Sequence, residues 1–514
     1  MRDQDTQTSL AAALLMTLLM IAEAAAANGD LPLVEAARNR DQAQVRALLN
    51  HHADVNVRSD DGSTALLWAA HWNDVETADL LVRAGANVNA ANDFRITPLS
   101  LACTNGSAAL VELLLKAGAN PNTSIATGET PIMTCASSGS ADAVRMLVAR
   151  GADVNAKQPS QNQTALMWAA AEHHADVVGI LIEAGADLRA HTKKGFTALH
   201  FAAREGDLES TRMLLAAGVN VNVRSEPDLS EKKRGAREAY GGGGVAGGSS
   251  EESVGSTPLL VATVRGQVPL ALFLLDQGAD PNVDDAGYTP LHWAAGLWES
   301  GVANPVYGFN DPMSGIPDRQ AKLQLVKALL AHGANPNGRI TQRLPGFAGG
   351  YTDVMGATPF LLASSVADTE MMRVLLAAGA DPALITGTNT TAVMAAAGLN
   401  HTSGENPVTE EQALEAVKFL LELGVDAKGV TSLGENALFG PAYRGWNTLL
   451  ELLIKKGADV NAVSKAGITP WLAASGLGDR LGGVLFNKEG AALLVKYGAD
   501  PKLGKPCQAQ NKCR

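Results

Sequence analysis

The chain has 514 residues and a formal net charge of −12, and its side chains are 46% hydrophobic but only 4% aromatic. One compact core cannot accommodate this length, so we expect either several domains or a repeat architecture. The acidic balance argues against a nucleic-acid partner, because phosphate binding requires a concentrated basic surface.

The N-terminal segment predicts export. An apolar run from Leu10 to Ala22 is followed by small residues up to Ala27, and Glu23 interrupts it. The run is too short to span a membrane comfortably, whereas an apolar core followed by A-x-A sites is typical of a secretory signal peptide. We therefore expect a signal peptide at residues 1–27 and a periplasmic or secreted mature chain without a membrane anchor.

From Leu31 to Pro501 one pattern recurs with a period of 33 or 34 residues where no insertion interrupts it. Apolar segments such as "TALLWAA" begin at Thr64, Thr97, Thr130, Thr164 and Thr197. The glycine that closes each of these units follows its threonine by 21 residues, at Gly85, Gly118, Gly151, Gly185 and Gly218. With the later units and a degenerate first copy after residue 30, the pattern predicts twelve units.

Each unit predicts two helices. The threonine is a helix cap, and the proline that often follows it occupies the first turn, where a missing N–H costs nothing. A glycine allows the positive φ that ends the first helix, and an amphipathic segment such as "ALVELLLKAG" forms the second helix. One unit leaves two apolar faces uncovered, so only stacking of neighbours creates a core.

These units closely resemble the ankyrin repeat, which has the consensus T-P-L-H-x-A and a 33-residue period. "TPLHWAA" at Thr289 matches the consensus, and "TALMWAA" at Thr164 looks like exported ankyrin proteins of bacterial type. Asn436 in place of threonine, the poor first unit and the insertions depart from it. The resemblance implies a monomeric all-α solenoid of about twelve helix pairs, with short β-hairpin fingers and a concave face that binds protein.

Polar side chains near Trp168 could suggest a metal or acid–base site: Glu172, His173, His174 and Asp176. We interpret them as a repeat turn, because His173 occupies the helix-ending position that is glycine in most units, where histidine tolerates a positive φ. Trp168 is expected to be a packing residue equivalent to Leu101 and Phe201. His200 and His292 fall on the histidine of the consensus, which the resemblance assigns to structural hydrogen bonding.

Insertions interrupt the repeats at about 225–256, 296–320, 338–357 and 398–412. "GGGGVAGGSS" in the first is read as a flexible linker, since no lysine follows as a phosphate-binding loop requires. The second and third carry aromatic residues and proline, so they either contact another molecule or pack back on the solenoid. An enzyme or enzyme-accessory protein whose site is built by residues 296–357 is the alternative function.

The four cysteines are of two kinds. Cys103 and Cys135 lie in apolar helical segments, and we expect them to be free thiols. Cys507 and Cys513, in the tail at 502–514, are expected to form a disulfide, as befits an exported protein. They lack the C-x-x-C-H pattern of a haem site and a second pair for zinc, so neither a cofactor nor a metal is expected.

The resemblance also implies where a partner binds. The exposed concave positions are the finger residues before each threonine and the pair that follows each first helix. In this chain they are His71, Trp72, Phe94, Lys193, Phe196, Arg204, Glu205, Tyr288, Tyr443 and Arg444. Several are aromatic or arginine, the types enriched in binding hot spots, although Trp72 and Phe196 could instead pack against adjacent fingers. No catalytic constellation is found, so the leading function is an exported, non-enzymatic protein-binding scaffold.

Overall fold

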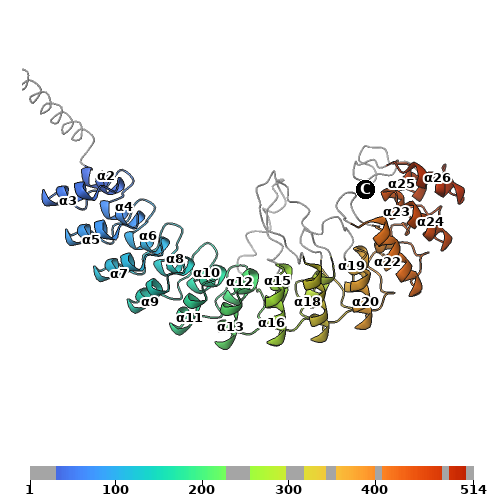
Figure 1. The fold of residues 1–514 in the computed structure, drawn as a ribbon, viewed down its shortest axis with the longest axis horizontal. Coiled ribbons are helices and arrows are strands. Elements are labelled where there is room, and N and C mark those ends of the chain that lie inside the picture. Colours follow the sequence, from blue (N-terminus) through green and yellow to red (C-terminus); the bar gives the residue numbers. More distant parts are fainter. Residues whose placement is uncertain are drawn as a thin grey trace, which may run out of the picture. The chain divides into compact units, whose positions relative to one another are not determined.

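The computed structural model describes residues 31–226, 255–296, 318–342, 355–399, 408–476 and 486–504. Over these ranges the chain forms twelve helix pairs and no β-strand, which confirms the predicted all-α repeat fold (Figure 1). The fingers between pairs are tight turns rather than β-hairpins in this part of the chain. The predicted signal peptide, Cys507, Cys513 and most of each insertion lie outside the described residues.

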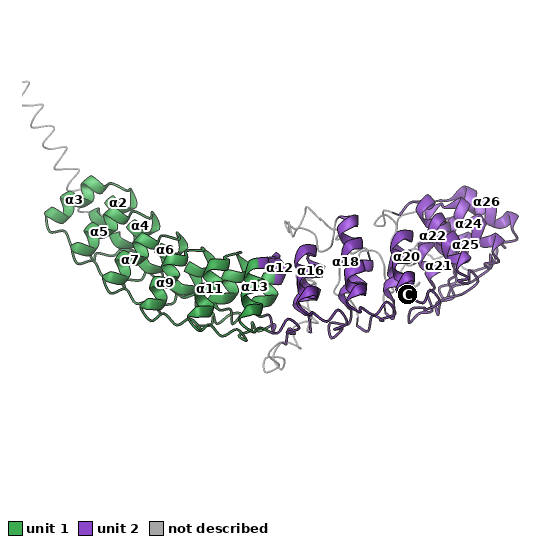
Figure 2. Ribbon diagram, turned by 60° about the horizontal axis from the view of Figure 1, so that its bottom comes forward, with its two compact units in different colours: residues 1–193, 197–202, 209–219 green, residues 194–196, 203–208, 220–514 purple. Residues whose placement is uncertain are grey.

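The chain divides into two compact units (Figure 2). Unit 1 comprises residues 1–193, 197–202 and 209–219, and the remaining residues form unit 2. The first helices of unit 1 are α2 (Pro32–Arg38), α4 (Ala65–His71), α6 (Pro98–Thr104), α8 (Pro131–Ser137) and α10 (Ala165–Ala171). Its second helices are α3 (Gln42–Asn50), α5 (Val75–Arg83), α7 (Ala108–Lys116), α9 (Ala141–Ala149) and α11 (Ala175–Glu183).

Helices α12 (Ala198–Glu205) and α13 (Leu208–Ala216) contain residues of both units. The first helices of unit 2 are α15 (Pro258–Val264), α17 (Pro290–Ala295), α19 (Pro359–Ser365), α21 (Ala392–Ala396), α23 (Phe439–Arg444) and α25 (Pro470–Ala474). Its second helices are α16 (Val268–Asp276), α18 (Arg319–Ala331), α20 (Thr369–Ala377), α22 (Glu410–Glu422), α24 (Asn447–Lys455) and α26 (Lys488–Lys496). Among the described residues, no helix has the length and apolar character that crossing a membrane requires.

Within unit 1 the helices form two layers. Each first helix contacts the first helix of the next repeat, and the second helices contact one another in the same order. The buried side chains between the layers are mainly small or branched, such as Ala102, Leu110 and Leu114. This composition explains why a chain so poor in aromatic residues can still build a continuous core, since each repeat needs only its neighbours.

The predicted helix signals are confirmed at most repeats. Thr97 accepts a hydrogen bond from the N–H of Ser100 at 3.2 Å, and Pro98 occupies the first turn of α6. His173 has a φ of 61° and ends the turn after α10, as expected from its position. Nε2 of His174 lies 3.0 Å from the carbonyl oxygen of Ser137, which ties this turn to the preceding repeat. The residues around His173 therefore form a repeat turn.

A ladder of asparagines links successive repeats. Nδ2 of Asn122 donates to the carbonyl of Gly151 at 3.0 Å, and its Oδ1 accepts from the N–H of Asp153 at 2.8 Å. The same pair of bonds to the next repeat recurs at Asn56, Asn89, Asn155, Asn222, Asn282, Asn337 and Asn461. The asparagine of the "ANPN" and "ADVN" turns thus hydrogen-bonds its own repeat to the next one.

We expect Asn122→Ala to lower the free energy of unfolding by about 2 kcal/mol, because it removes two hydrogen bonds worth roughly 1 kcal/mol each. Arg189 stands at the same repeat position, where the structure shows no such pair of bonds, and its side chain is exposed. Arg189→Ala is therefore the matched control and should change stability by less than about 0.5 kcal/mol. Urea unfolding of both variants tests this prediction. Equal losses in the free energy of unfolding would contradict the role of Asn122 in joining the repeats.

The structure corrects the expectation for two cysteines. Cys103 and Cys135 are fully buried and form a disulfide, with their Cα atoms 4.4 Å apart. They lie on α6 and α8, the first helices of adjacent repeats, so stacking brings them together. The prediction of two free thiols was wrong, because the two cysteines meet only when α6 and α8 stack. The predicted bond between Cys507 and Cys513 stays a prediction.

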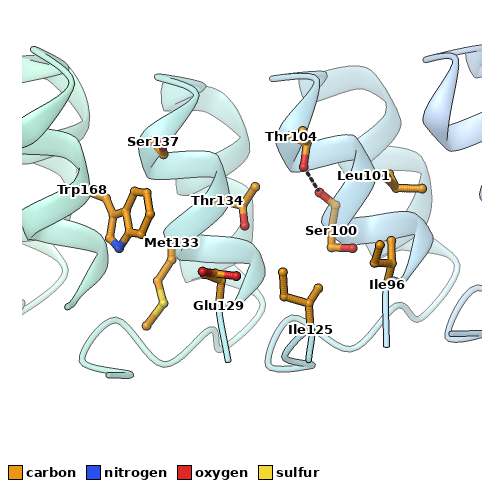
Figure 3. Close-up of a pocket in the computed structure, with 10 residues that line it drawn as sticks. All are labelled: Ile96, Ser100, Leu101, Thr104, Ile125, Glu129, Met133, Thr134, Ser137 and Trp168. Atoms are coloured by element: carbon orange, nitrogen blue, oxygen red, sulfur yellow. Dashed lines mark hydrogen bonds between the residues drawn. The ribbon is translucent and has the colours of Figure 1, made fainter. Parts of the chain in front are cut away.

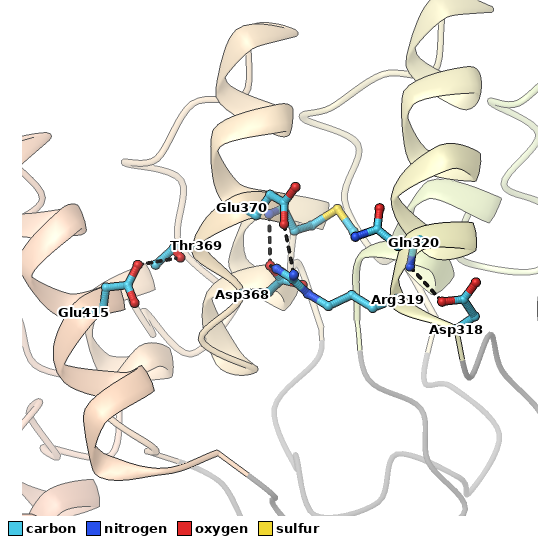
Figure 4. Close-up of polar contacts among 8 residues, drawn as sticks. Asp318, Arg319, Gln320, Asp368, Thr369, Glu370 and Glu415 are labelled. Carbon is cyan, nitrogen blue, oxygen red and sulfur yellow. Dashed lines mark hydrogen bonds and ion pairs between the residues drawn. The ribbon is translucent and has the colours of Figure 1, made fainter.

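In unit 2, polar contacts join the start of α20 to the start of α18, which follows an insertion, and to the middle of α22 (Figure 4). Arg319 lies 2.9 Å from a carboxylate oxygen of Asp368 and 2.9 Å from one of Glu370. The hydrogen bond from Asp368 contributes most to raising the pKa of Arg319. Thr369 in turn donates to Glu415 on α22 at 3.0 Å. These contacts fix the second helices to one another despite the interrupted repeat.

The repeat that begins with Asn436 departs from the others in its first helix. Oδ1 of Asn436 accepts from the N–H of Leu438 at 3.1 Å, and α23 begins only at Phe439. A Cβ on Gly440 would lie 2.1 Å from the carbonyl oxygen of Ala397, so this glycine permits a close approach to the preceding repeat. Where asparagine replaces threonine, the first helix therefore begins later than in the other repeats, and the repeat still forms a helix pair.

Candidate functional site

The described residues contain no group of three or more histidine, cysteine, aspartate or glutamate side chains that could hold a metal ion. The predicted partner-binding residues fall on both units. We use "front face" for the surface of unit 1 formed by its first helices and fingers. The insertions of the alternative function lie mostly outside the described residues, so the structure describes no site there.

Trp72 and His71 form an exposed aromatic pair at the end of α4. Trp72 is 41% exposed, and its Nε1 donates to the carbonyl of Arg38 in the preceding repeat at 2.9 Å. The rings of His71 and Trp72 meet edge to face, with centroids 4.7 Å apart, and the guanidinium carbon of Arg40 lies 5.9 Å from the centroid of Trp72. These contacts hold the Trp72 ring in place while part of it faces solvent.

Phe94 is the most exposed large hydrophobic side chain in the described part of unit 1, at 64%. It lies on the finger before α6, and its carbonyl accepts from the N–H of Ala126 on the next finger at 3.0 Å. The backbone of neighbouring fingers is therefore joined while the ring of Phe94 remains in solvent. Exposure of Trp72 and Phe94 agrees with the sequence reading; partner binding by either remains a prediction.

The structure corrects two of the predicted contact residues. Phe196 is only 7% exposed and Tyr288 only 1%. Tyr288 belongs to a buried cluster with Ile340 and Leu361, and its ring centroid lies 5.8 Å from that of Trp293. Both stand immediately before a capping threonine, at the base of a finger, where most repeats place a buried or half-buried side chain. Tyr288 packs between repeats, and neither side chain presents a free surface.

The remaining predicted contact residues are half-buried and dispersed. Lys193 belongs to unit 1, whereas Arg204, Glu205, Tyr443 and Arg444 belong to unit 2. Arg204 and Glu205 form an ion pair at 2.6 Å. The guanidinium carbon of Arg444 lies 4.9 Å from the ring centroid of Trp446, and burial lowers the pKa of Arg444. Within the predicted set, His71 therefore contacts Trp72 and Arg204 contacts Glu205, and the two pairs lie in different units.

Sequence reading missed a pocket of about 240 Å³ on the front face (Figure 3). The pocket arises because Thr134 is small, whereas the residues at the same position in the two neighbouring repeats, Leu101 and Trp168, are large. The lining residues come from three repeats and are Ile96, Ser100, Leu101, Thr104, Ile125, Glu129, Met133, Thr134, Ser137 and Trp168. Trp168 is therefore a wall of this pocket as well as a packing residue.

Family models of known proteins agree with the repeat pattern of this chain. A family model described as ankyrin repeats in three copies matches residues 9–92, 84–158 and 157–225, and a single-repeat model matches 254–286. The first match of the three-copy model begins at residue 9, within the segment predicted to be a signal peptide. Among solved structures, the human ASB11 ankyrin repeat domain is 30% identical, covering 38% of this chain and 87% of that chain with a TM-score of 0.35. A comparison with curated proteins gives no match.

Proposed function

Because this chain is an ankyrin-repeat protein, a class that points to protein-interaction scaffolds, we propose that it is an exported, non-enzymatic scaffold. In this proposal its front face binds a partner protein. The observation that carries the proposal is the exposure of Trp72 and Phe94 on that face, in a chain with few aromatic residues. Aromatic side chains held in place supply contact area at little cost in conformational entropy, which is why they dominate binding hot spots.

The partner surface has a defined extent in unit 1. His71 and Trp72 lie at the end of α4, and Phe94 lies on the finger that precedes α6. These side chains belong to adjacent repeats, and α4 and α6 are in contact. One partner can therefore cover all three side chains. Phe196 and Tyr288, being buried, are left out of this surface.

Export is supported by two features of the chain. The N-terminal apolar run with small residues after it has the composition of a signal peptide. The disulfide between Cys103 and Cys135 favours an oxidising compartment, since cytosolic thiols are normally kept reduced. The protein is accordingly proposed to act in the periplasm or outside the cell.

We expect Phe94→Ala to weaken binding of the native partner by about 2 kcal/mol, a loss of roughly 30-fold in affinity, because truncation removes a central aromatic anchor. Trp72→Ala should weaken binding similarly, but it also breaks the hydrogen bond to Arg38, so its melting temperature must be checked. The measurement is affinity capture from the periplasmic or secreted fraction, followed by titration with the purified partner.

The matched controls are Glu112→Ala and Lys116→Ala on α7. These residues form an exposed ion pair at 2.6 Å on the second-helix layer, away from the fingers. Exposed ion pairs contribute little to stability, so both variants should remain folded and capture the partner as the wild type does. If the α7 variants abolish capture and Phe94→Ala does not, the front face is not the binding surface.

A further inference from the structure

The pocket on the front face is sized for one side chain. Its volume of about 240 Å³ is below the roughly 300–1,000 Å³ typical of sites that enclose a small-molecule ligand or cofactor. It is lined by two successive fingers and by the first helices of three consecutive repeats of unit 1, as Figure 3 shows. A partner that covers the front face could therefore insert a single side chain here.

Most of the pocket wall is apolar. Ile96 and Ile125 come from two successive fingers, Leu101 and Met133 from α6 and α8, and Trp168 from α10. Such walls favour burial of the methylene groups of an inserted side chain, because transfer of apolar surface out of water is favourable. The occupant therefore needs a long aliphatic stem.

The one acidic side chain in the lining is Glu129, which is half-buried. The hydroxyl of Thr127 donates to Oε2 of Glu129 and holds the carboxylate on its finger. The described residues provide no ion pair for Glu129, and Oε1 accepts no hydrogen bond from them. A carboxylate in apolar surroundings attracts a cation, and a charge-assisted hydrogen bond is stronger than a neutral one.

We propose that this pocket receives an arginine side chain of the partner protein, an inference that rests on the proposed function. The stem of the arginine packs against Ile96, Leu101 and Met133, and its guanidinium donates to Oε1 of Glu129. Arginine fits better than lysine because its planar, weakly hydrated guanidinium also stacks on aromatic rings, and Trp168 forms one wall. The pocket is continuous with the proposed surface, since the finger that carries Glu129 is hydrogen-bonded to the finger of Phe94.

The test titrates the full chain with N-acetyl-arginine amide and with its neutral isostere N-acetyl-citrulline amide. Binding is followed by the NMR signal of the indole N–H of Trp168, which Trp168→Phe identifies. The arginine probe should shift this signal saturably and bind at least about tenfold more tightly than the citrulline probe, the factor that corresponds to one charge-assisted bond. Equal affinities for the two probes would overturn the proposal.

Two variants separate the pocket from the rest of the fold. Glu129→Gln keeps the shape of the side chain and should reduce arginine binding to the citrulline level, whereas Glu112→Gln on α7 should leave it unchanged. Thr134→Leu places in the pocket the residue that the preceding repeat has at this position, Leu101, and should block both probes. If Glu129→Gln retains the preference for arginine, or Thr134→Leu leaves probe binding intact, the pocket is not the site.

Partner capture distinguishes this inference from the function it rests on. Glu129→Gln and Thr134→Leu should weaken capture of the native partner by at least about tenfold, consistent with the loss of one buried charge-assisted contact. If Phe94→Ala weakens capture and both pocket variants do not, the front face binds the partner but the arginine assignment is wrong. If wild type captures no partner, the proposed function fails and the arginine assignment fails with it.

Discussion

Replacing Cys103 and Cys135 together by alanine will lower the free energy of unfolding by about 3–4 kcal/mol. The disulfide joins residues 32 positions apart in sequence, and closing a loop of that length restricts the unfolded chain by roughly this amount. The two sulfur atoms are also buried between α6 and α8, so their removal adds a packing loss.

Reductant provides the internal control for the cysteine prediction. It should lower the urea midpoint of the wild type toward that of the double alanine variant and leave that variant unchanged. Alkylation of the denatured, unreduced protein, read by mass spectrometry, should leave Cys103 and Cys135 unmodified. Alkylation of both would show that the bond does not form in the cell, and would remove one of the two supports for export.

Acidification from pH 7 to pH 4 will lower stability by about 3 kcal/mol through His292 alone. Burial lowers the pKa of His292 from 6.5 to about 4 in the folded chain. The geometry agrees: the N–H of Thr289 donates to Nδ1 at 3.1 Å, so Nδ1 must be unprotonated, and Nε2 donates to the carbonyl of Gly338 at 2.9 Å. Protonation of Nδ1 would place its N–H against the N–H of Thr289, so that two donors would face each other.

The sign of the pH effect follows from which state binds the proton. Between pH 6.5 and about 4 the unfolded chain carries a protonated histidine and the folded chain a neutral one, so stability falls as the pH falls. The loss of stability is negligible at pH 7, grows as the pH falls through 6.5 and reaches about 3 kcal/mol at pH 4.

His292→Leu is the matched variant, because leucine occupies the same repeat position at Leu67, Leu260 and Leu361. Urea unfolding at intervals from pH 7 to pH 4 should show a flatter profile for this variant, although it loses the hydrogen bond to Gly338 at every pH. Identical pH profiles for the variant and the wild type would show that His292 does not titrate on unfolding in this range.

The sequence by itself determined the repeat, because its signals are local. Thr97 accepts the N–H of a residue three positions away, and His173 takes a positive φ within its own turn. Such interactions lie within one helix or turn, so their spacing in sequence fixes where helices begin and end. This is why twelve helix pairs could be counted before any tertiary contact was known, and why the residues around His173 were correctly read as a turn.

Only the tertiary structure decided what lies between repeats. Stacking of the repeats brings together residues about one repeat apart, as in the disulfide between Cys103 and Cys135 and the hydrogen bond from Asn122 to Gly151. Stacking also buries the base of a finger, as at Phe196. The pocket beside Glu129 depends on a difference in side-chain size across three neighbours. A sequence compared with its own repeat shows which positions are equivalent, whereas contact between equivalent positions is set by how closely the helices pack.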